Sequence, residues 1–182
     1  MGEEQLHLKI VVTGPESSGK TLLAGALAAA LNAICAPEFA RYYVAHLGRP
    51  YVHADLRPIG RGQKAWESWY AARVPGAGRQ NLLICDTDWT VLQVWEQYRF
   101  GVDSDFLWQE GYGIPQQADL YLLCAPDFPW QPDPLREHPE ERDVLFGMYK
   151  QLLRDNNARF TVMQGDPGTR LQQALSVIAE LF

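Results

Sequence analysis

The stretch VVTGPESSGKTLL, from Val11 to Leu23, decides the fold of this 182-residue chain. It fits the pattern G-x-x-x-x-G-K-[ST] through Gly14, Gly19, Lys20 and Thr21, with a strand-like apolar run before it and a helix-like run after it. Glycines in such a loop allow successive backbone N–H groups to point at a phosphate. The N-terminus of the following helix adds a partial positive charge. The sequence therefore predicts a binding site for the phosphates of ATP or GTP.

The loop also predicts how a nucleotide and its metal ion are held. Lys20 can reach the β- and γ-phosphates, and the Thr21 hydroxyl suits a Mg²⁺ ligand. A turn that only connects a strand to a helix is the structural alternative, which the matching context disfavours. The predicted ATP contacts are all eight loop residues: Gly14, Pro15, Glu16, Ser17, Ser18, Gly19, Lys20 and Thr21.

Strand-like and helix-like segments alternate along the rest of the chain. Apolar runs predict strands at residues 6–12, 33–36, 81–85, 120–124 and 160–163, and helix-like segments separate them. This alternation implies right-handed crossovers. We expect one α/β domain over residues 1–182, a three-layer P-loop NTPase fold. Its five-stranded, mostly parallel sheet would carry helices on both faces, and a lid region would lie at about 126–142.

Composition and charge exclude several classes of protein. Apolar residues make up 47% and charged residues 21%, which is typical of a globular domain. A formal net charge of −6 argues against nonspecific binding to nucleic acid or an anionic membrane. The start resembles no signal peptide, and no apolar run is long enough to span a bilayer. Cys35, Cys85 and Cys124 lack metal-ligand spacing, so we expect buried free thiols in a cytoplasmic protein.

Two carboxylates follow the third predicted strand. Asp86 stands directly after four apolar residues, where a P-loop protein needs a carboxylate that holds Mg²⁺ directly or through water. A turn or helix-cap role is the alternative for Asp86. Asp88 can either cap the helix that begins near Thr90 or bind substrate, and the sequence leaves both roles open.

The acceptor side of the site is predicted from two further stretches. Glu38 and Arg41 follow the second strand, at the edge where ligands bind in open α/β folds. Glu38 could orient an acceptor hydroxyl or take its proton, and Arg41 could contact substrate, unless the two form only a surface ion pair. Arg136 and Arg142 follow a rigid, proline-rich and aromatic loop. They would meet developing charge as part of a lid, unless they are only solvated helix residues.

Several of these stretches together resemble a known family. GPESSGKT, PEFARYY, the Gln63 of IGRGQ, ICDTDW and DLYLLCAPDFPWQPDPLR occur in the order seen in the kinase domain of NadR-type proteins. The resemblance covers roughly residues 9–181. The P-loop is generic, whereas the E-[FY]-x-R, D-T-D and P-W-x-x-D-x-x-R elements are more specific. The resemblance implies a nucleoside-kinase-like fold that uses ATP and Mg²⁺ to convert nicotinamide riboside to nicotinamide mononucleotide.

The resemblance also implies roles for individual residues. Glu38 and Arg41 would line the riboside pocket, and Asp86 and Asp88 would serve the metal and the ribose. Residues 130–136 would lead into the lid. Bifunctional relatives carry a helix-turn-helix and an adenylyltransferase domain, and with so few residues before the first strand we expect neither here. The expected catalytic set is Lys20, Glu38, Asp86, Arg136 and Arg142, with Glu38 or Asp86 as the base.

Two positions depart from the family pattern. Pro134 stands where glycine is expected before Leu-Arg, and Pro37 stands where some relatives place an aromatic residue that stacks on the nicotinamide. Trp66 and Trp69 are the expected replacements for that stacking group.

The turn at 165–168 could face the nucleotide base or only reverse the chain. A kinase for another nucleoside or nucleotide, and a regulatory P-loop ATPase switch, remain the alternative functions.

Overall fold

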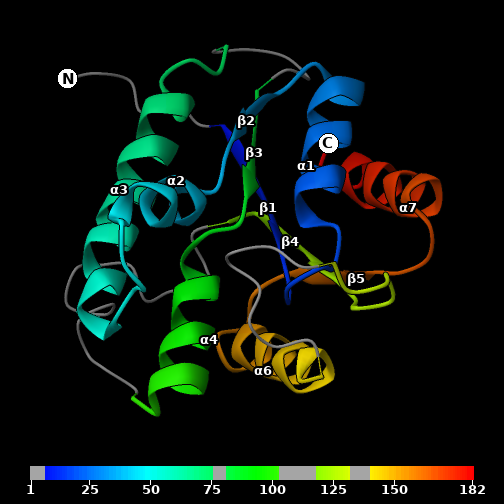
Figure 1. The fold of residues 1–182 in the computed structure, drawn as a ribbon. Helices are drawn as coiled ribbons and strands as arrows, with labels where there is room; N and C mark the ends of the chain where they lie inside the picture. Colours follow the sequence, from blue (N-terminus) through cyan, green and yellow to red (C-terminus); the bar gives the residue numbers. More distant parts are fainter. Residues whose placement is uncertain (1–6, 76–80, 103–117, 132–139) are drawn as a thin grey trace.

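A computed structural model describes residues 7–75, 81–102, 118–131 and 140–182. The fold contains a five-stranded sheet, and Figure 1 shows helices on both of its faces. The strands are β1 (Leu8–Thr13), β2 (Ile34–Ala36), β3 (Leu82–Asp86), β4 (Leu120–Cys124) and β5 (Phe160–Met163). The helices are α1 (Lys20–Leu31), α2 (Phe39–Leu47), α3 (Leu56–Ala71), α4 (Trp89–Phe100), α6 (Arg142–Asp155) and α7 (Pro167–Ala179), with a 3₁₀ turn at His53–Asp55.

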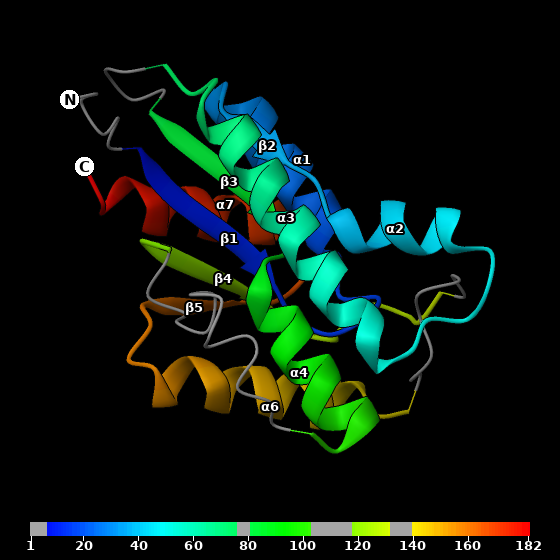
Figure 2. The ribbon, with the colours of Figure 1, turned by 90° about the vertical axis from the view of Figure 1, so that its left-hand side faces the viewer.

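All four strand pairings are parallel, and the strand order is β2-β3-β1-β4-β5. Figure 2 shows the strands side by side in this order. Val11 of β1 pairs with Cys85 of β3 and with Tyr121 of β4. Every residue of β3 and β4 is buried, as expected of a parallel sheet covered on both faces. The predicted five-stranded parallel α/β fold is therefore confirmed.

Two hydrophobic layers hold the sheet. Alternate residues of β1 point to opposite faces, so Ile10 packs with α1 and α7 while Val11 packs with α4 and α6. The first layer includes Leu27 and Ile178, each at most 1% exposed. No helix in the described part of the chain is long and apolar enough to cross a membrane. The helices cover the two faces of the sheet, and the connecting loops lie at the carboxyl ends of the strands.

The three cysteines lie in strands and form no disulfide. Cys85 and Cys124 are buried, and Cys35 is half-buried. Burial raises the pKa of both Cys35 and Cys124 to about 11. At neutral pH these thiols are protonated and act as small apolar side chains, as the sequence predicted for a free, structural cysteine.

The predicted helix-leaning region from 41 to 74 divides into two helices. α2 ends at Gly48, whose φ of 68° terminates the helix, and α3 begins after the 3₁₀ turn. A Cβ atom at Gly60 would overlap the ring of Trp89, and one at Gly62 would overlap the ring of Phe39. These glycines let α3 pack closely against the first turns of α4 and α2. Both of those turns lie at the carboxyl edge of the sheet.

Candidate active site

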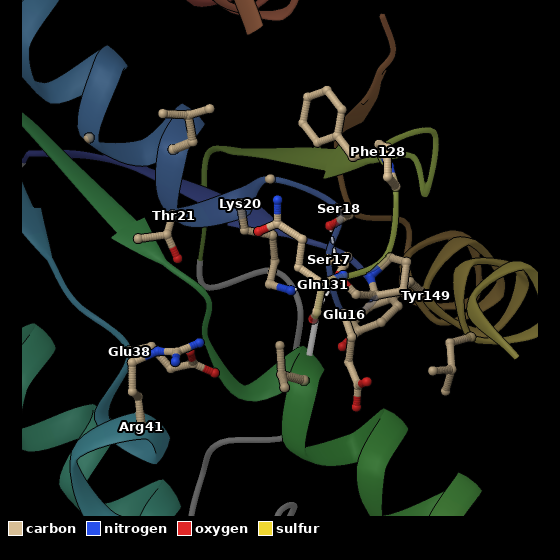
Figure 3. A pocket seen from close by; sticks show the side chains of 18 of the residues that line it. Glu16, Ser17, Ser18, Lys20, Thr21, Glu38, Arg41, Phe128, Gln131 and Tyr149 are labelled. Atoms are coloured by element: carbon tan, nitrogen blue, oxygen red, sulfur yellow. Dashed lines mark hydrogen bonds and ion pairs between the residues drawn. The ribbon is translucent and has the colours of Figure 1, made fainter. Parts of the chain in front are cut away.

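A cavity of about 730 Å³ opens at the carboxyl edge of the sheet. All eight residues of the glycine-rich loop line it, together with Glu38 and Arg41. Figure 3 shows Glu38 and Arg41 approaching the cavity from a different side than the loop residues Ser17 and Lys20. The remaining wall comes from α1, α4, α6 and the segment after β4. The structure therefore brings the predicted phosphate loop and the predicted acceptor residues to one space.

The loop has the backbone conformation that its glycines allow. Gly14 has a φ of 136° and Gly19 a φ of 80°, both in the region that L side chains rarely adopt. A Cβ atom at Gly14 would lie 2.6 Å from the carbonyl oxygen of Cys124. Lys20 Nζ donates a 2.8 Å hydrogen bond to the carbonyl of Pro15, which folds its ammonium group back over the loop. An anion can therefore meet both the loop amides and this ammonium group.

Asp86, the predicted metal carboxylate, does not itself line the cavity but forms a hydrogen bond with Thr21, which does. It ends β3, pairs with Val12 of β1 and is 4% exposed. Its Oδ1 atom has no hydrogen-bond partner among the described residues. Burial raises the pKa of Asp86, whereas a hydrogen bond with Thr21 and the charges of Lys20 and Arg41 lower it. A buried oxygen that lacks a partner, beside a threonine hydroxyl, suits the oxygen ligands that Mg²⁺ prefers.

The described residues contain no group of three or more His, Cys, Asp or Glu side chains that could hold a metal. A phosphate-linked Mg²⁺ site needs only one or two carboxylates, which act together with substrate phosphates and water. Asp86 and Thr21 supply one carboxylate and one hydroxyl. The donor set therefore fits Mg²⁺ bound with a nucleotide better than a site built only from protein side chains.

Asp88 takes the capping role that the sequence had left open. Its Oδ1 atom accepts hydrogen bonds from the backbone N–H of Thr90 at 3.0 Å and from the Thr90 hydroxyl at 2.7 Å. Its Oδ2 atom accepts one from the Tyr121 hydroxyl at 3.0 Å. Asp88 is 4% exposed and does not line the cavity. One carboxylate oxygen thus accepts hydrogen bonds from α4 and the other from β4, so the geometry does not support the expected contact of Asp88 with substrate.

Glu38 is the N-cap residue of α2, with a backbone that is still extended (φ −69°, ψ 112°). Its carboxylate lies 3.6 Å from Nε of Arg41, one helical turn later. The side chain of Glu38 is 11% exposed and that of Arg41 is 47% exposed. The ion pair that the sequence offered as an alternative is therefore present, and it stands on the cavity wall. The ion pair is therefore compatible with the predicted roles of Glu38 toward an acceptor hydroxyl and of Arg41 toward substrate.

Of the two predicted lid arginines, Arg142 lies in the described part of the chain. Arg142 begins α6 and donates a 2.7 Å hydrogen bond to the carbonyl of Phe128, so it holds the segment after β4. It does not line the cavity. Arg136 and Pro134 lie outside the described residues. The described start of the predicted lid is joined to the phosphate loop, because the backbone N–H of Gln131 donates to Ser17 Oγ at 3.2 Å.

Trp66 and Trp69 do not line the cavity, contrary to the expectation that they would stack on a substrate ring. The Trp66 ring packs edge-on against Phe39 at 5.0 Å between centroids. Trp69 is 52% exposed, and the guanidinium of Arg73 lies 3.1 Å from its ring centre. α3 instead directs Gln63 and Glu67 into the fold, whereas Trp66 packs against α2 and Trp69 is exposed.

Other aromatic residues line the cavity instead. They are Trp95 of α4, Phe128 after β4 and Tyr149 of α6. Trp95 follows Val91 by one helical turn, and Tyr149 follows Leu145 in the same way, with all four on the cavity wall. This i, i+4 spacing on two helices is the sequence signal that could have identified them.

Arg170 is a functional-site residue that the sequence reasoning missed. Only 1% exposed, it donates hydrogen bonds to the carbonyls of Ser18, Ala125 and Gly165 and pairs with Asp127. It therefore ties the phosphate loop to the ends of β4 and β5. Its spacing with the buried Ala174 and Ile178, at i, i+4 and i+8, marks it as facing inward.

The turn at 165–168 does not line the cavity. Asp166 is the N-cap of α7 and accepts a 3.0 Å hydrogen bond from the backbone N–H of Thr169. The backbone N–H of Gly165 donates a 2.8 Å hydrogen bond to Asp127, in the segment after β4. Of the two predictions for this turn, the structure supports the reversal of the chain between β5 and α7.

Known proteins share this sequence pattern and fold. A family model described as an AAA domain matches residues 9–170. The trifunctional NAD biosynthesis/regulator protein NadR of Salmonella typhimurium is 26% identical over 183 aligned residues, which cover 95% of this chain and 42% of that protein. NadR of Escherichia coli gives the same values. This chain thus spans less than half the length of these curated relatives.

Solved structures agree on the fold. NadR in complex with NR superposes with a TM-score of 0.78 at 24% identity, over 96% of this chain and 51% of that one. NadR with NAD and AMP-PNP gives 0.74 at 22% identity, over 96% and 49%. Thymidylate kinase from Ehrlichia chaffeensis gives 0.63 at 16% identity, over 95% and 98%. Because the family match extends over most of its length, this chain belongs to the AAA-domain family of P-loop proteins and is homologous to NadR.

Proposed function

We propose that this protein is an ATP-dependent kinase that phosphorylates the 5′-hydroxyl of nicotinamide riboside to give nicotinamide mononucleotide. The observation that carries the proposal is the shared cavity, which the phosphate loop lines on one side and Glu38 and Arg41 line on another. Homology to NadR, a NAD biosynthesis protein whose solved forms include complexes with NR and with AMP-PNP, supports this choice of acceptor and donor. Residues 1–182 would then form one kinase domain.

The donor side would be bound by the loop and Lys20. On nucleotide binding, the ammonium group of Lys20 exchanges the neutral carbonyl of Pro15 for a phosphate oxygen, which is the stronger acceptor because it is charged. Thr21 and Asp86 would hold Mg²⁺, which when bound neutralises charge on the β- and γ-phosphates. The unpartnered Oδ1 of Asp86 supports this assignment.

The acceptor side would be organised by Glu38 and Arg41. A loose phosphoryl-transfer transition state needs positioning more than strong base catalysis. Glu38 would accept a hydrogen bond from the 5′-hydroxyl and keep it in line with the γ-phosphorus. Arg41 forms an ion pair with this carboxylate at 3.6 Å. Arg136 stays a predicted lid arginine, and Arg142 would act through the loop that it holds.

The nicotinamide ring is planar and cationic, so it favours the face of an aromatic side chain. Trp95 is the best-placed described residue for this contact, because it lines the cavity and is held from behind. Its ring stacks on Tyr51 at 5.8 Å with an interplanar angle of 24°, and Arg99 lies 4.2 Å from the centre of the Tyr51 ring. Such a supported ring would be a rigid platform for the acceptor.

The deciding experiment is an acceptor panel. Purified protein with ATP and Mg²⁺ is incubated with nicotinamide riboside, adenosine, thymidine, deoxyadenosine or thymidine monophosphate, and products are separated by chromatography. We expect nicotinamide mononucleotide and an equal amount of ADP, and no product with Lys20→Ala. Faster turnover of another acceptor would reassign the substrate within the kinase class. Slow ADP release that no acceptor stimulates would instead indicate a regulatory ATPase switch.

A further inference from the structure

A chain of buried polar groups links the middle of the sheet to the start of α2, and the site described above does not use it. Gln63 and Glu67 of α3 are 3% and 9% exposed. The backbone N–H of Phe39 donates to Gln63 Oε1 at 2.8 Å, and Gln63 Nε2 donates to Glu67 Oε1 at 3.1 Å. Lys9 Nζ of β1 donates to Glu67 Oε2 at 2.6 Å. This series of hydrogen bonds therefore ends at the first peptide of α2.

At its other end, in the sheet, this series of hydrogen bonds begins with a buried ion pair. The side chains of Lys9 and Glu67 are only 12% and 11% exposed. Burial alone would lower the pKa of Lys9, but the charge of Glu67 raises it above its usual value, so Lys9 stays cationic. A buried pair is maintained only when its remaining hydrogen-bonding capacity is met, and Gln63 meets it at the second oxygen of Glu67.

This pairing fixes the orientation of the Gln63 amide. An amide has one acceptor oxygen and one donor nitrogen, and the nitrogen must face the carboxylate of Glu67. Its oxygen is then directed to the N–H of Phe39. A glutamine without the carboxylate could turn over and present its donor to that N–H, which would break the contact. Glu67 and Lys9 thus determine which atom meets α2.

The contact at α2 replaces a missing local cap. The first amides of a helix have no acceptor within the helix, and an N-cap side chain usually accepts from one of them. Glu38 is the N-cap of α2, yet its side chain caps no amide of the helix and lies beside Arg41 on the cavity wall. Gln63 accepts the first amide, that of Phe39, from a neighbouring helix. Gly62 allows this approach, because a Cβ atom there would overlap the Phe39 ring.

We propose that Gln63, oriented by Glu67 and Lys9, is a positioning residue for the phosphoryl acceptor. It fixes the peptide between Glu38 and Phe39 and so holds the Glu38 carboxylate at the acceptor side of the cavity. The inference rests on the proposed function in one respect, namely that Glu38 orients the acceptor hydroxyl. Its structural part, the cap supplied by Gln63, can be tested without any activity.

The kinetic test is a double-mutant cycle between Gln63→Leu and Glu38→Gln. Leucine keeps the side-chain size and removes both hydrogen bonds. If Gln63 acts through Glu38, Gln63→Leu alone lowers kcat/KM for the acceptor on the order of 10- to 100-fold, as misplacement of a reacting group does. The KM for ATP should stay within about twofold, because the phosphate loop is not touched. In the Glu38→Gln background the same change should have almost no further effect.

Two further variants separate positioning from general damage. Ile59→Val also removes buried contacts of α3 but leaves the hydrogen bond from the Phe39 N–H to Gln63 in place, so it should lower the melting temperature without lowering the acceptor kcat/KM. The exchanged pair Gln63→Glu with Glu67→Gln keeps the total charge and leaves at position 63 an oxygen that can accept from the Phe39 N–H, although the hydrogen bond between positions 63 and 67 then runs in the opposite direction. It should recover most of the activity that Gln63→Leu loses, which a residue of merely local packing would not require.

Amide hydrogen exchange measures the cap directly. We expect a protected Phe39 amide in the wild-type protein and exchange at least about tenfold faster in Gln63→Leu but not in Ile59→Val. Unchanged exchange at Phe39, or an equal loss of kcat/KM in both Glu38 backgrounds, would overturn the proposal. If no acceptor is phosphorylated by the wild-type protein, the proposed function fails, while loss of Phe39 protection in Gln63→Leu would still support the cap.

Discussion

Replacement of Asp86 by asparagine should separate folding stability from metal binding. Asp86 is 4% exposed, its Oδ1 lacks a partner among the described residues, and burial raises its pKa. Such a charge opposes folding at neutral pH. Asparagine removes the charge at nearly the same volume and keeps an oxygen for the Thr21 hydroxyl. We expect the variant, without metal and nucleotide, to be more stable than the wild type by about 1 kcal/mol. The gain is limited because attraction to Lys20 and Arg41 is lost.

The difference in folding stability between Asp86→Asn and the wild type should increase as the pH rises. A carboxyl group whose pKa is higher in the folded protein destabilises the fold as the pH rises above the unfolded value, which is about 3.9 for aspartate. The difference between Asp86→Asn and the wild type should therefore vanish below about pH 4. It should be complete once the pH exceeds the raised pKa of Asp86.

Thermal unfolding, followed by fluorescence with EDTA and then with Mg²⁺ and ATP, measures both effects. For a chain of this size 1 kcal/mol corresponds to about 2–4 °C. Saturating Mg·ATP at about 100 times its Kd should stabilise the wild type by about 2.7 kcal/mol. The wild type should then be more stable than Asp86→Asn. Asp166→Asn is the matched control, since hydrogen bonds from Thr169 lower the pKa of Asp166, and this variant should gain no stability. A lower melting temperature of Asp86→Asn in EDTA, or an undiminished Mg·ATP shift, would refute the reasoning.

Three other changes test different parts of the site. Trp95→Leu should raise the KM for the acceptor on the order of tenfold, the loss of a cation–π contact, without changing the KM for ATP. Trp69→Leu, on the exposed face of α3, should leave both KM values unchanged in the same steady-state assay. Arg170→Met should lower the free energy of unfolding by about 3 kcal/mol in urea titrations, because it leaves three carbonyls and the Oδ1 atom of Asp127 without the donor that Arg170 supplies. An effect of Trp69→Leu equal to that of Trp95→Leu would contradict the assignment of the acceptor wall.

The fold was predictable because its main signals are local. Five apolar runs and the phosphate-loop pattern gave the number of strands and their parallel arrangement. The strand order depends on contacts between distant segments, such as the pairing of β1 with both β3 and β4, which no local pattern encodes. The proximity of Glu38 and Arg41 to the phosphate loop was predictable, because parallel strands end at the same edge.

The aromatic wall was not predictable in the same way. The buried face of α3 carries Leu56 and Ile59 in its first turn but Gln63 and Glu67 further along, so apolar residues do not mark the buried side of its second half. Trp66 and Trp69 were therefore expected at the acceptor wall, although neither residue lines the cavity. Arg170 is a similar case, because an arginine is rarely buried and its role depends on three carbonyls from distant parts of the chain.

The burial of Arg170 behind the phosphate loop has an electrostatic consequence. A trans peptide is planar, with its C=O and N–H pointing in opposite directions. Because the carbonyl of Ser18 is directed at the guanidinium, the N–H of Gly19 in the same peptide points away from it, and Gly19 lines the cavity. Arg170 thus aligns a peptide dipole with its positive end outward. A chain with a net charge of −6 can in this way offer positive potential to an anion without exposing the cation that produces it.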